Sequence, residues 1–442
     1  MELKNKNVLI YGMGKSGQAT NALLLLYEAN IFILDDKTST NKEKEFYKTQ
    51  DFLNTLDLCV VSPSISINNK FLKKLRKNNI KIITEVELGA LYCKSKIITV
   101  TGTDGKTTTV NLLNNILKNC KKTSKMTGNI GYPLTQYVRE DNKKEFAVCE
   151  LSSFMLEYSP QINSQLCIVL NVTSDHLDRH RNIKNYIKSK QNAVKMLKNN
   201  AYCVLNYDNK QTKRMSKLTK ADVYFVSLNK KVKGCYIHNS NIIFNNGNKE
   251  YFVMNIKDIQ LIGSHNLYNV LSCVCASLLL GVKIKQLKDC IKNFKPLEHR
   301  IEYVSTINNI KFYNDSKATT VNSCLCAVNS FDNNLVLILG GKSKNTNFNK
   351  LCKQIIKKVK YIILIGETSE EIKNILNKLK FKNYTVTDNL TNSVKYAYEK
   401  CLPSGTVLLS PSCASFDMFS CYEERGEKFK QEVEKLKNEV KM

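Results

Sequence analysis

The stretch Val100-Thr101-Gly102-Thr103-Asp104-Gly105-Lys106-Thr107-Thr108 decides the fold of this 442-residue chain. The apolar and β-branched residues 97–101 predict a strand, and residues 106–118 predict a helix. A glycine-rich turn between a buried strand and a helix is typical of a phosphate-binding loop, because backbone N–H groups and the helix N-terminus attract anions. Val100 replaces the first glycine of the usual pattern, but Gly105-Lys106-Thr107 is retained. We therefore predict a site for a nucleoside triphosphate.

A second glycine-rich loop lies near the N-terminus. Gly12-Met13-Gly14-Lys15-Ser16-Gly17 follows a predicted strand at residues 8–11 and opens a predicted helix. Asp35 and Asp36 end the next strand, roughly twenty residues on, which is the dinucleotide-binding spacing. The pattern leaves open whether NAD or a nucleotide-sugar diphosphate binds, since both present a diphosphate to the loop.

Short β-branched runs alternate with helical periodicity along the whole chain. Strands are predicted at residues 31–34, 58–62, 80–84, 146–151, 166–171, 203–206, 311–314, 335–339, 361–365 and 406–410. This alternation predicts an α/β protein whose largely parallel sheets are flanked by helices. Residues 231–260 predict a hairpin that elaborates the central part. Boundaries near residues 94–96 and 295–297 give three domains, at residues 1–94, 95–296 and 297–442.

Composition and charge narrow the function classes. The chain has 67 Lys and Arg residues and 39 Asp and Glu residues, which gives a net charge of +28. The lysines are scattered along the chain rather than gathered in one basic block. We therefore favour anionic small substrates over nucleic acid. The sixteen cysteines are dispersed, without a CxxC pair, and predict reduced thiols. No apolar run approaches the roughly 18 residues of a membrane span, so we expect a cytoplasmic protein with no membrane partner.

Two phosphate loops on separate domains favour ATP-driven chemistry over hydride transfer. An NAD-dependent oxidoreductase would explain residues 12–36 but would leave Gly105-Lys106-Thr107 without a role. A basic nucleic-acid-binding module is a second alternative, which the charge alone suggests.

Six further segments resemble one family, the ATP-dependent Mur ligases of peptidoglycan synthesis. They occur in the family's order and spacing over nearly the entire chain. The segments are Gly128-Asn129-Ile130-Gly131, Glu150-Leu151-Ser152-Ser153-Phe154, Asn171-Val172-Thr173-Ser174-Asp175-His176-Leu177-Asp178-Arg179, Tyr186-Ile187-Lys188-Ser189-Lys190, His265-Asn266-Leu267-Tyr268-Asn269 and His299-Arg300.

Within the family, four signals resemble the members that add D-glutamate. They are the N-terminal glycine-rich loop, Ser62-Pro63-Ser64-Ile65, Asn314-Asp315-Ser316-Lys317-Ala318-Thr319 and Leu409-Ser410-Pro411-Ser412-Cys413-Ala414-Ser415-Phe416-Asp417. Another amino-acid-adding member, or a related folyl- or cyanophycin-type ligase, stays open as an alternative.

The resemblance implies a fold and a reaction. The fold is a Rossmann-like domain for the UDP-substrate, a P-loop ATPase domain and a dinucleotide-fold C-terminal domain. In the implied reaction ATP phosphorylates the carboxylate of UDP-N-acetylmuramoyl-L-alanine, and the amine of D-glutamate then attacks the acyl phosphate. The implied partners are these three substrates, with the enzyme acting as a monomer.

The resemblance also assigns the catalytic, ATP and metal sites. The implied catalytic residues are Lys106, Glu150, His176 and Lys190. The implied ATP-binding residues are Gly102, Thr103, Asp104, Gly105, Lys106, Thr107, Thr108, Asn266, Asn269, Arg300 and Asp315. Two Mg²⁺ ions would be held by Thr107, Glu150, His176 and carbamylated Lys190. Because a lysine ammonium near Mg²⁺ is repelled, its pKa falls, and the neutral amine can add CO₂.

The two remaining substrates have their own residue sets. The implied UDP-substrate residues are Gly14, Lys15, Ser16, Asp35, Lys37, Asn129 and His176. The implied D-glutamate residues are Lys317, Thr319, Lys344, Ser415 and Tyr422. The chain departs from the family pattern at Asp104, Ser64 and Lys342-Ser343, and the last departure makes the loop that contains Lys344 more basic.

Overall fold

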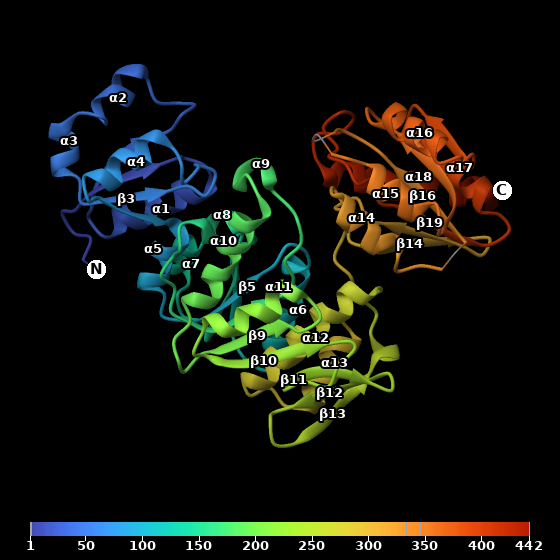
Figure 1. Ribbon diagram of the computed structural model, residues 1–442, viewed down its shortest axis with the longest axis horizontal. Helices are drawn as coiled ribbons and strands as arrows, with labels where there is room; N and C mark the ends of the chain where they lie inside the picture. Colours follow the sequence, from blue (N-terminus) through green and yellow to red (C-terminus); the bar gives the residue numbers. More distant parts are fainter. Residues whose placement is uncertain (1, 333, 344–345, 442) are drawn as a thin grey trace. The chain divides into compact units, whose positions relative to one another are not determined.

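The computed structural model describes residues 2–332, 334–343 and 346–441. The chain forms three sheets that are divided over two compact units (Figure 1). One unit comprises Met1–Ile259 and Tyr268–Asn293, and the other comprises Gln260–Leu267 and Phe294–Met442. The first two sheets lie in the first unit and the third lies in the second unit.

The first sheet has four parallel strands in the order β2-β1-β3-β4. Its strands are β1 Asn7–Tyr11, β2 Asn30–Leu34, β3 Leu58–Val61 and β4 Lys81–Thr84. Its helices are α1 Lys15–Leu26, α2 Asn41–Phe46, α3 Gln50–Thr55, α4 Lys70–Lys77 and α5 Glu85–Tyr92. The central strands β1 and β3 are buried almost throughout, because helices cover both faces of a parallel sheet. The loops that follow these two strands therefore lie side by side at one edge.

The second sheet has nine strands in the order β13-β12-β11-β10-β9-β8-β5-β7-β6. Its strands are β5 Lys96–Thr101, β6 Ser124–Gly128, β7 Phe146–Glu150, β8 Ser164–Val169, β9 Tyr202–Asn206, β10 Asp222–Ser227, β11 Gly234–His238, β12 Asn241–Asn245 and β13 Glu250–Asn255. The α-helices of this region are α6 Lys106–Asn119, α7 Leu134–Glu140, α8 Ser153–Glu157, α9 Leu177–His180, α10 Ile183–Lys195, α11 Lys210–Met215, α12 Ser264–Leu279 and α13 Ile284–Lys292. Two 3₁₀ turns are η1 Ser216–Leu218 and η2 Ile256–Asp258.

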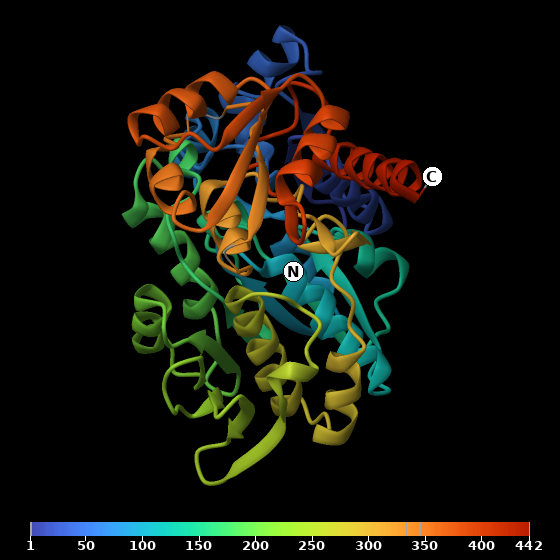
Figure 2. The same ribbon diagram turned by 90° about the vertical axis from the view of Figure 1, so that its right-hand side faces the viewer.

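Strand direction in the second sheet changes at one end. Strands β5 to β11 pair in parallel, whereas β12 and β13 pair antiparallel to their neighbours. These two strands form the hairpin predicted from residues 231–260, drawn in yellow-green in Figure 2. The carboxyl ends of the parallel strands β8, β5, β7 and β6 point the same way, toward the side of the sheet where parallel α/β folds place their ligand sites.

One hydrophobic core continues from the first sheet into the second. Leu23 of α1, Val86 of α5 and Tyr137 of α7 belong to the same buried cluster. The α5–α7 contact is close, because a Cβ on Gly89 would meet Leu134 at 2.8–2.9 Å. This shared core explains why the first two sheets form one compact unit. The predicted domain boundaries, after residue 94 and after residue 296, stay predictions.

The third sheet has six strands in the order β14-β15-β19-β16-β17-β18. Its strands are β14 Glu302–Ile307, β15 Ile310–Asn314, β16 Leu335–Leu339, β17 Val359–Ile365, β18 Tyr384–Thr387 and β19 Gly405–Leu409. Its helices are α14 Val321–Val328, α15 Asn349–Ile355, α16 Ser369–Lys378, α17 Leu390–Cys401 and α18 Tyr422–Lys441. Only β14, among the strands described for this sheet, pairs antiparallel.

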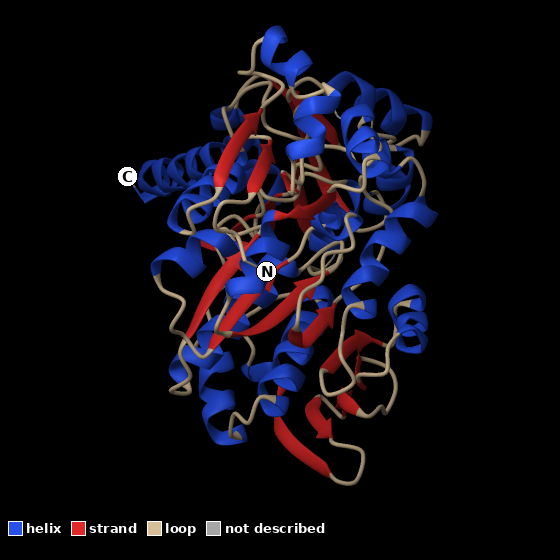
Figure 3. Cartoon of the chain, turned by 90° about the vertical axis from the view of Figure 1, so that its left-hand side faces the viewer, coloured by secondary structure: helices blue, strands red, loops and turns tan. Residues whose placement is uncertain are grey.

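The predicted fold class is confirmed. Mostly parallel strands alternate with helices that flank the sheets, and Figure 3 shows these helices in blue around the red strands. All sixteen cysteines lie in the described part of the chain as free thiols, and most of them are buried.

Candidate active site

The loop at residues 102–105 connects β5 to α6, as the sequence predicts. Gly105 adopts a left-handed φ of 86°, and a Cβ at this position would meet Asn269 Oδ1 at 2.3 Å. The structure therefore brings Asn269, a predicted ATP residue on α12, against the loop. Both requirements exclude a side chain at position 105, because an L-residue would be strained and would also clash.

Two lysines share one carbonyl of this loop. Lys106 Nζ donates to Gly102 O at 2.9 Å and to Thr103 O at 2.7 Å. Lys190 Nζ, which reaches the loop from α10, donates to Gly102 O at 2.7 Å and to Thr101 Oγ1 at 3.2 Å. Lys190 is fully buried, and this burial, together with the positive charge of Lys106, lowers the pKa of its ammonium well below the ordinary value. The structure thus places both predicted catalytic lysines beside the loop.

Thr107 and Glu150 form the second feature of the loop. Thr107 Oγ1, on the first turn of α6, donates to Glu150 Oε2 at 3.0 Å. Asn129 Nδ2 donates to Glu150 Oε1 at 2.9 Å, so the carboxylate is held from both sides. Glu150 is buried at the carboxyl end of β7. A hydroxyl and a carboxylate oxygen side by side are hard oxygen ligands of the kind that Mg²⁺ prefers, so these residues fit the predicted metal.

Asn171 holds the phosphate loop, a role that was not predicted from the sequence. Its Oδ1 accepts from the backbone N–H groups of Thr103 and Asp104 at 3.1 and 2.9 Å, and its Nδ2 donates to Asp104 O at 3.0 Å. The Thr103 hydroxyl is hydrogen-bonded to Tyr186 OH, 2.9 Å away, which ties the loop to α10. An asparagine two residues after the end of a central strand is the signal that could have suggested this role.

His176 lies at the N-cap of α9 with a left-handed φ of 50°. Its side chain is about half exposed, and its Nε2 lies 3.4 Å from Asp175 Oδ2. Asp175 Oδ1 also accepts from the His176 backbone N–H at 2.9 Å. The ring of Phe154 meets the imidazole edge-on at 4.9 Å between centroids. Nothing in these contacts tests whether His176 binds the second metal, so that role stays a prediction.

The N-terminal loop has the geometry of a diphosphate site. Gly14 precedes α1, whose first residues are Lys15 and Ser16. A Cβ on Gly17 would meet Gly12 O at 2.1 Å, so helix and loop approach too closely for a side chain. The structure thus leaves the backbone N–H groups at the N-terminus of α1 beside an open face at Gly14, where an anion can approach.

Asp35 links this loop to the turn after β2. Its Oδ2 accepts from Met13 N at 2.8 Å, and its Oδ1 accepts from Lys37 N at 2.9 Å. These backbone hydrogen bonds lower the pKa of the carboxyl. Asp35 therefore shapes the loop itself, and its predicted contact with the UDP-substrate stays a prediction.

The predicted residues of the second unit gather around β15 and α18. Lys317 Nζ lies 3.5 Å from the centroid of the Tyr422 ring, and the His299 ring meets Tyr422 edge-on at 6.0 Å. Asp315 accepts from Ser410 Oγ at 2.8 Å and from Ile301 N at 3.3 Å. Burial raises the pKa of the Asp315 carboxyl to about 7. The predicted acceptor residue Lys344 lies outside the described residues.

Arg425 connects two of the predicted acceptor segments, although the sequence analysis gave it no role. Its Nε donates to Ser316 Oγ at 2.9 Å, and its terminal nitrogens donate to the carbonyls of Ser316, Cys413 and Ala414 at 2.8–3.2 Å. Burial lowers the pKa of this guanidinium to about 10. Thr319 and Ser415 lie on the two segments that Arg425 joins.

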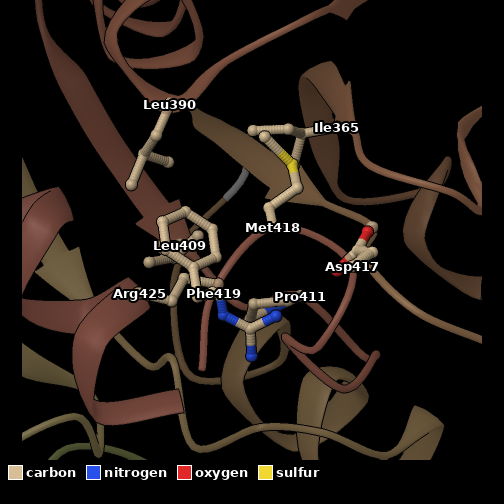
Figure 4. A pocket seen from close by; sticks show the side chains of 10 residues that line it. Ile365, Leu390, Leu409, Pro411, Asp417, Met418, Phe419 and Arg425 are labelled. Atoms are coloured by element: carbon tan, nitrogen blue, oxygen red, sulfur yellow. The ribbon is translucent and has the colours of Figure 1, made fainter. Parts of the chain in front are cut away.

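A small pocket lies at the carboxyl ends of β16, β17 and β19. Gly340 and Gly341 form part of its wall, with Asp417 and Arg425, and Figure 4 shows the labelled side chains converging on it. The predicted D-glutamate residues that the structure describes are not among those lining it.

Asn266 lies in the first turn of α12, which begins at Ser264. Its Nδ2 donates to Ile262 O at 2.8 Å. Asn266 therefore lies inside the helix and not at its N-cap, because α12 begins two residues earlier. Arg300 lies in the same unit, where its positive charge contributes to lowering the pKa of His265 to about 4, after burial.

Comparisons with known proteins agree with this geometry. The Mur ligase middle domain family matches residues 100–277, and the Mur ligase glutamate ligase domain family matches residues 299–413. The UDP-N-acetylmuramoylalanine–D-glutamate ligase of Caldicellulosiruptor bescii is 36% identical over 99% of each chain. The protein of the same name from Lachnoclostridium phytofermentans is 35% identical over 99% of this chain and all of its own.

A solved structure shows the same fold. The MurF ligase of Thermotoga maritima in complex with ADP has a TM-score of 0.62, is 17% identical, and covers 98% of this chain and 96% of its own. Within the described residues, we find no helix of the length and apolar character that a membrane crossing requires. Because its relatives are 35–36% identical over 99% of the chain and two Mur ligase domain families match it, the chain belongs to the Mur ligase family.

Proposed function

We propose that this chain is an ATP-dependent ligase that joins D-glutamate to UDP-N-acetylmuramoyl-L-alanine in the synthesis of peptidoglycan precursors. The observation that carries the proposal is full-length similarity, at 33–36% identity, to relatives named for this activity. The phosphate loop with Lys106 supplies the ATP site that such a ligase needs. We place the reaction in the cytoplasm, where ATP and UDP-linked substrates are available.

The chemistry divides into two transfers. First, a carboxylate oxygen of the UDP-substrate attacks the γ-phosphorus of ATP, and the bond to the bridging oxygen of ADP breaks. The D-glutamate amine then attacks the acyl carbon, the bond to phosphate breaks, and the amine loses a proton as the amide forms. Splitting the reaction in this way replaces a poor leaving group, the carboxylate oxygen, with phosphate.

The residues of the phosphate loop suit the first transfer. Backbone N–H groups at residues 103–107 and the Lys106 ammonium can stabilise the charge of the triphosphate. Lys106 now donates to two carbonyls of its own loop, so ATP would exchange these partners for phosphate oxygens. Asn171 holds the loop in place by hydrogen bonds, and Asn269 lies close against Gly105, which reduces the reorganisation needed when ATP binds.

The metal sites follow from the oxygen ligands. Thr107 and Glu150 would hold one Mg²⁺, and His176 with carbamylated Lys190 would hold the other. When bound, Mg²⁺ neutralises charge on the transferred phosphoryl group. Asn129, which donates to Glu150, would keep that carboxylate oriented.

Burial supports the carbamylation of Lys190. Burial favours the neutral amine of Lys190 over the ammonium, and a neutral amine can add CO₂ with loss of one proton. The product is an anion, which suits a site that also holds Lys106. Lys188, two residues away on α10, is exposed and lacks this environment.

The UDP-substrate and D-glutamate sites are assigned by resemblance together with the contacts described above. We place the nucleotide at Gly14, Lys15, Ser16, Asp35 and Lys37, with Asn129 and His176 toward the reacting carboxylate. We place D-glutamate at Lys317, Thr319, Ser415 and Tyr422, where cations and hydroxyl donors can meet its carboxylates.

An isotope experiment tests both the function and the route. UDP-N-acetylmuramoyl-L-alanine is labelled with ¹⁸O in its carboxylate and incubated with ATP, Mg²⁺ and D-glutamate. We expect phosphate release that depends on D-glutamate, and one ¹⁸O atom in each released phosphate. No phosphate release with D-glutamate would contradict the function, whereas release without label would contradict only the acyl phosphate.

A further inference from the structure

Arg179 connects two segments that lie far apart in the sequence. Its Nη1 donates to Ser64 O at 2.7 Å, and its Nη2 donates to Pro63 O at 3.2 Å and also to Ile65 O. Its Nε and Nη2 donate to Glu157 Oε2 at 3.1 and 2.9 Å. The side chains of Arg179 and Glu157 are only 12% and 11% exposed, so the ion pair between them is largely shielded from water.

The segment that receives Arg179 belongs to the nucleotide end of the first sheet. Residues 62–65 follow β3, which pairs with β1, so they lie beside the glycine-rich loop after β1. A Cβ on Gly12 would meet Ser62 Cβ at 2.7 Å and Ile65 Cγ1 at 3.7 Å. The conformation of residues 62–65 therefore decides the space next to the loop where we place the UDP-substrate.

The other side of Arg179 belongs to the reaction centre. Arg179 lies three residues after His176, on the short helix α9. Its guanidinium lies 5.1 Å from the centroid of the Phe154 ring, which in turn contacts His176. Phe154 and Glu157 both lie on α8, three residues apart and thus on one face of the helix. α8 begins shortly after Glu150, so one short segment supports both Arg179 and the metal-ligand candidate.

The donor pattern requires arginine in particular. Three carbonyls and one carboxylate surround the side chain, and a planar guanidinium with five N–H donors can reach all four at once. A lysine would keep the charge but has three donors on one atom, so it cannot span the 63–65 carbonyls and Glu157 together. Tyr158 OH adds a parallel contact, donating to Ile65 O at 2.8 Å.

We propose that Arg179 is a positioning residue that fixes the loop at residues 62–65 for the nucleotide and, through Phe154, fixes His176 for the reacting carboxylate. One side chain thereby sets the distance between the two ends of the UDP-substrate. The kinetic part of this inference rests on the proposed function, and the structural part does not.

The test combines amide hydrogen exchange with steady-state kinetics on the full chain. Arg179→Lys, Arg179→Met and Glu157→Gln are compared with Arg181→Lys and Arg181→Met, a matched arginine two residues away that is exposed. In the wild type, Ile65 N donates to Ser62 O. In the ligand-free Arg179 variants we expect faster amide exchange over residues 62–69, and in the Arg181 variants we expect the exchange rates of the wild type.

The kinetics separate positioning from general damage. For Arg179→Lys we expect the KM for the UDP-substrate to rise about tenfold or more, with the KM for ATP within about twofold of wild type, because charge-assisted hydrogen bonds to one substrate's loop are lost. Glu157→Gln should shift the same KM by a smaller factor. Arg181→Lys should match wild type in all three KM values.

Each other result has a defined meaning. Amide exchange over residues 62–69 that is unchanged in Arg179→Lys would overturn the inference, even if the ligase activity of that variant were reduced. Faster exchange with equal rises in all three KM values would overturn the positioning role. If Arg179→Met does not fold, the lysine variant and Glu157→Gln still decide. If the wild type does not use D-glutamate, the proposed function fails, while the exchange data still test the contact between Arg179 and residues 62–65.

Discussion

Lys190 is a fully buried lysine whose pKa is lowered, first by burial and then by Lys106. Its Nζ lies beside the phosphate loop, whereas Lys188 on the same helix is exposed. Two lysines two residues apart thus have opposite environments. This pair makes the carbamylation proposal testable with a control on the same helix.

We expect Lys190→Ala to lose at least about 100-fold in kcat, the scale of losing a preorganised electrostatic group, while it still binds the UDP-substrate. Lys188→Ala should stay close to wild type. Turnover assays and calorimetric titration of the UDP-substrate provide the measurements, and ¹³C NMR with labelled bicarbonate should show a carbamate signal in wild type and Lys188→Ala. Full activity of Lys190→Ala would refute the proposal.

Asp315 offers a pH prediction. Burial raises the pKa of its carboxyl to about 7, against an ordinary value of 3.8. The folded protein therefore binds this proton more tightly than the unfolded chain does, and the free energy of unfolding should fall as pH rises from about 4 to about 7. Asp315→Asn removes this dependence. The free energy of unfolding of the variant minus that of the wild type should therefore increase as pH rises across that range.

Urea unfolding without ligands, at about pH 5 and about pH 7.5, measures this difference. Asp388→Asn is the control, because Asp388 is exposed and its hydrogen bonds, that from Asn392 foremost, lower the pKa of its carboxyl. That variant should show no gain as pH rises. A pH-independent difference between Asp315→Asn and wild type would contradict the assignment of a raised pKa.

Single residues could be predicted from the sequence where a motif carried them. Lys106, Thr107 and Glu150 lie together as expected, because a strand-loop-helix pattern and a strand-end acid define their places. Arg179, Asn171 and Arg425 were not predicted to hold loops. Their partners are backbone carbonyls and N–H groups of distant segments, and such pairings depend on tertiary contacts that no local pattern records.

At the scale of elements, the glycine-rich loop after β1 contains two glycines with different environments. A Cβ on Gly17 would meet Gly12 O at 2.1 Å, whereas a Cβ on Gly14 has open space around it. Gly14 also has an ordinary φ of −68°. Gly17 is therefore required by packing, and Gly14 is not.

We expect Gly17→Ala to lower the free energy of unfolding by about 1–3 kcal/mol, the usual cost of overpacking, and Gly14→Ala, at the N-cap of α1, to lower it by less than about 1 kcal/mol. Denaturant unfolding followed by circular dichroism gives both values. Equal stability of the two variants would mean that α1 can shift away from β1, against the close approach described here.

The elements themselves were predictable where they are apolar and central. The strands expected at residues 203–206 and 335–339 match β9 and β16, because buried strands read as continuous apolar runs. Strands β6 and β18 were not predicted, since Ser124–Gly128 and Tyr384–Thr387 lie at sheet edges and contain few apolar residues. Strand β14, Glu302–Ile307, was not predicted either, and its antiparallel pairing with β15 depends on a tertiary contact that the residue pattern does not record.

At the scale of the whole molecule, the sequence predicted three sheets but not the core that joins the first two. That core is built by α1, α5 and α7, whose packing depends on Gly89. The first two sheets consequently belong to one compact unit, and a single buried cluster has members on both sides of residue 94. Local composition at residues 94–96 could not reveal this, because the contacts come from segments on either side.

Ligand binding should stabilise the molecule in a pattern specific to its proposed substrates. We expect ATP with Mg²⁺, and separately UDP-N-acetylmuramoyl-L-alanine, to raise Tm, and we expect NADH to leave it unchanged. A ligand present at 100 times its Kd should raise the free energy of unfolding by about 2.7 kcal/mol. Lys106→Ala should lose the ATP shift and keep that of the UDP-substrate. Stabilisation by NADH and not by ATP would favour the oxidoreductase alternative.

The most direct test of the central claim is a competition for the amino-acid site. The protein is incubated with UDP-N-acetylmuramoyl-L-alanine, ATP, Mg²⁺ and an equimolar mixture of D-glutamate, L-alanine and meso-diaminopimelate. The products are identified by mass spectrometry. We predict a single new product, with the mass of the UDP-substrate plus D-glutamate less one water. A product carrying either other amino acid, or no product containing D-glutamate, would contradict the account.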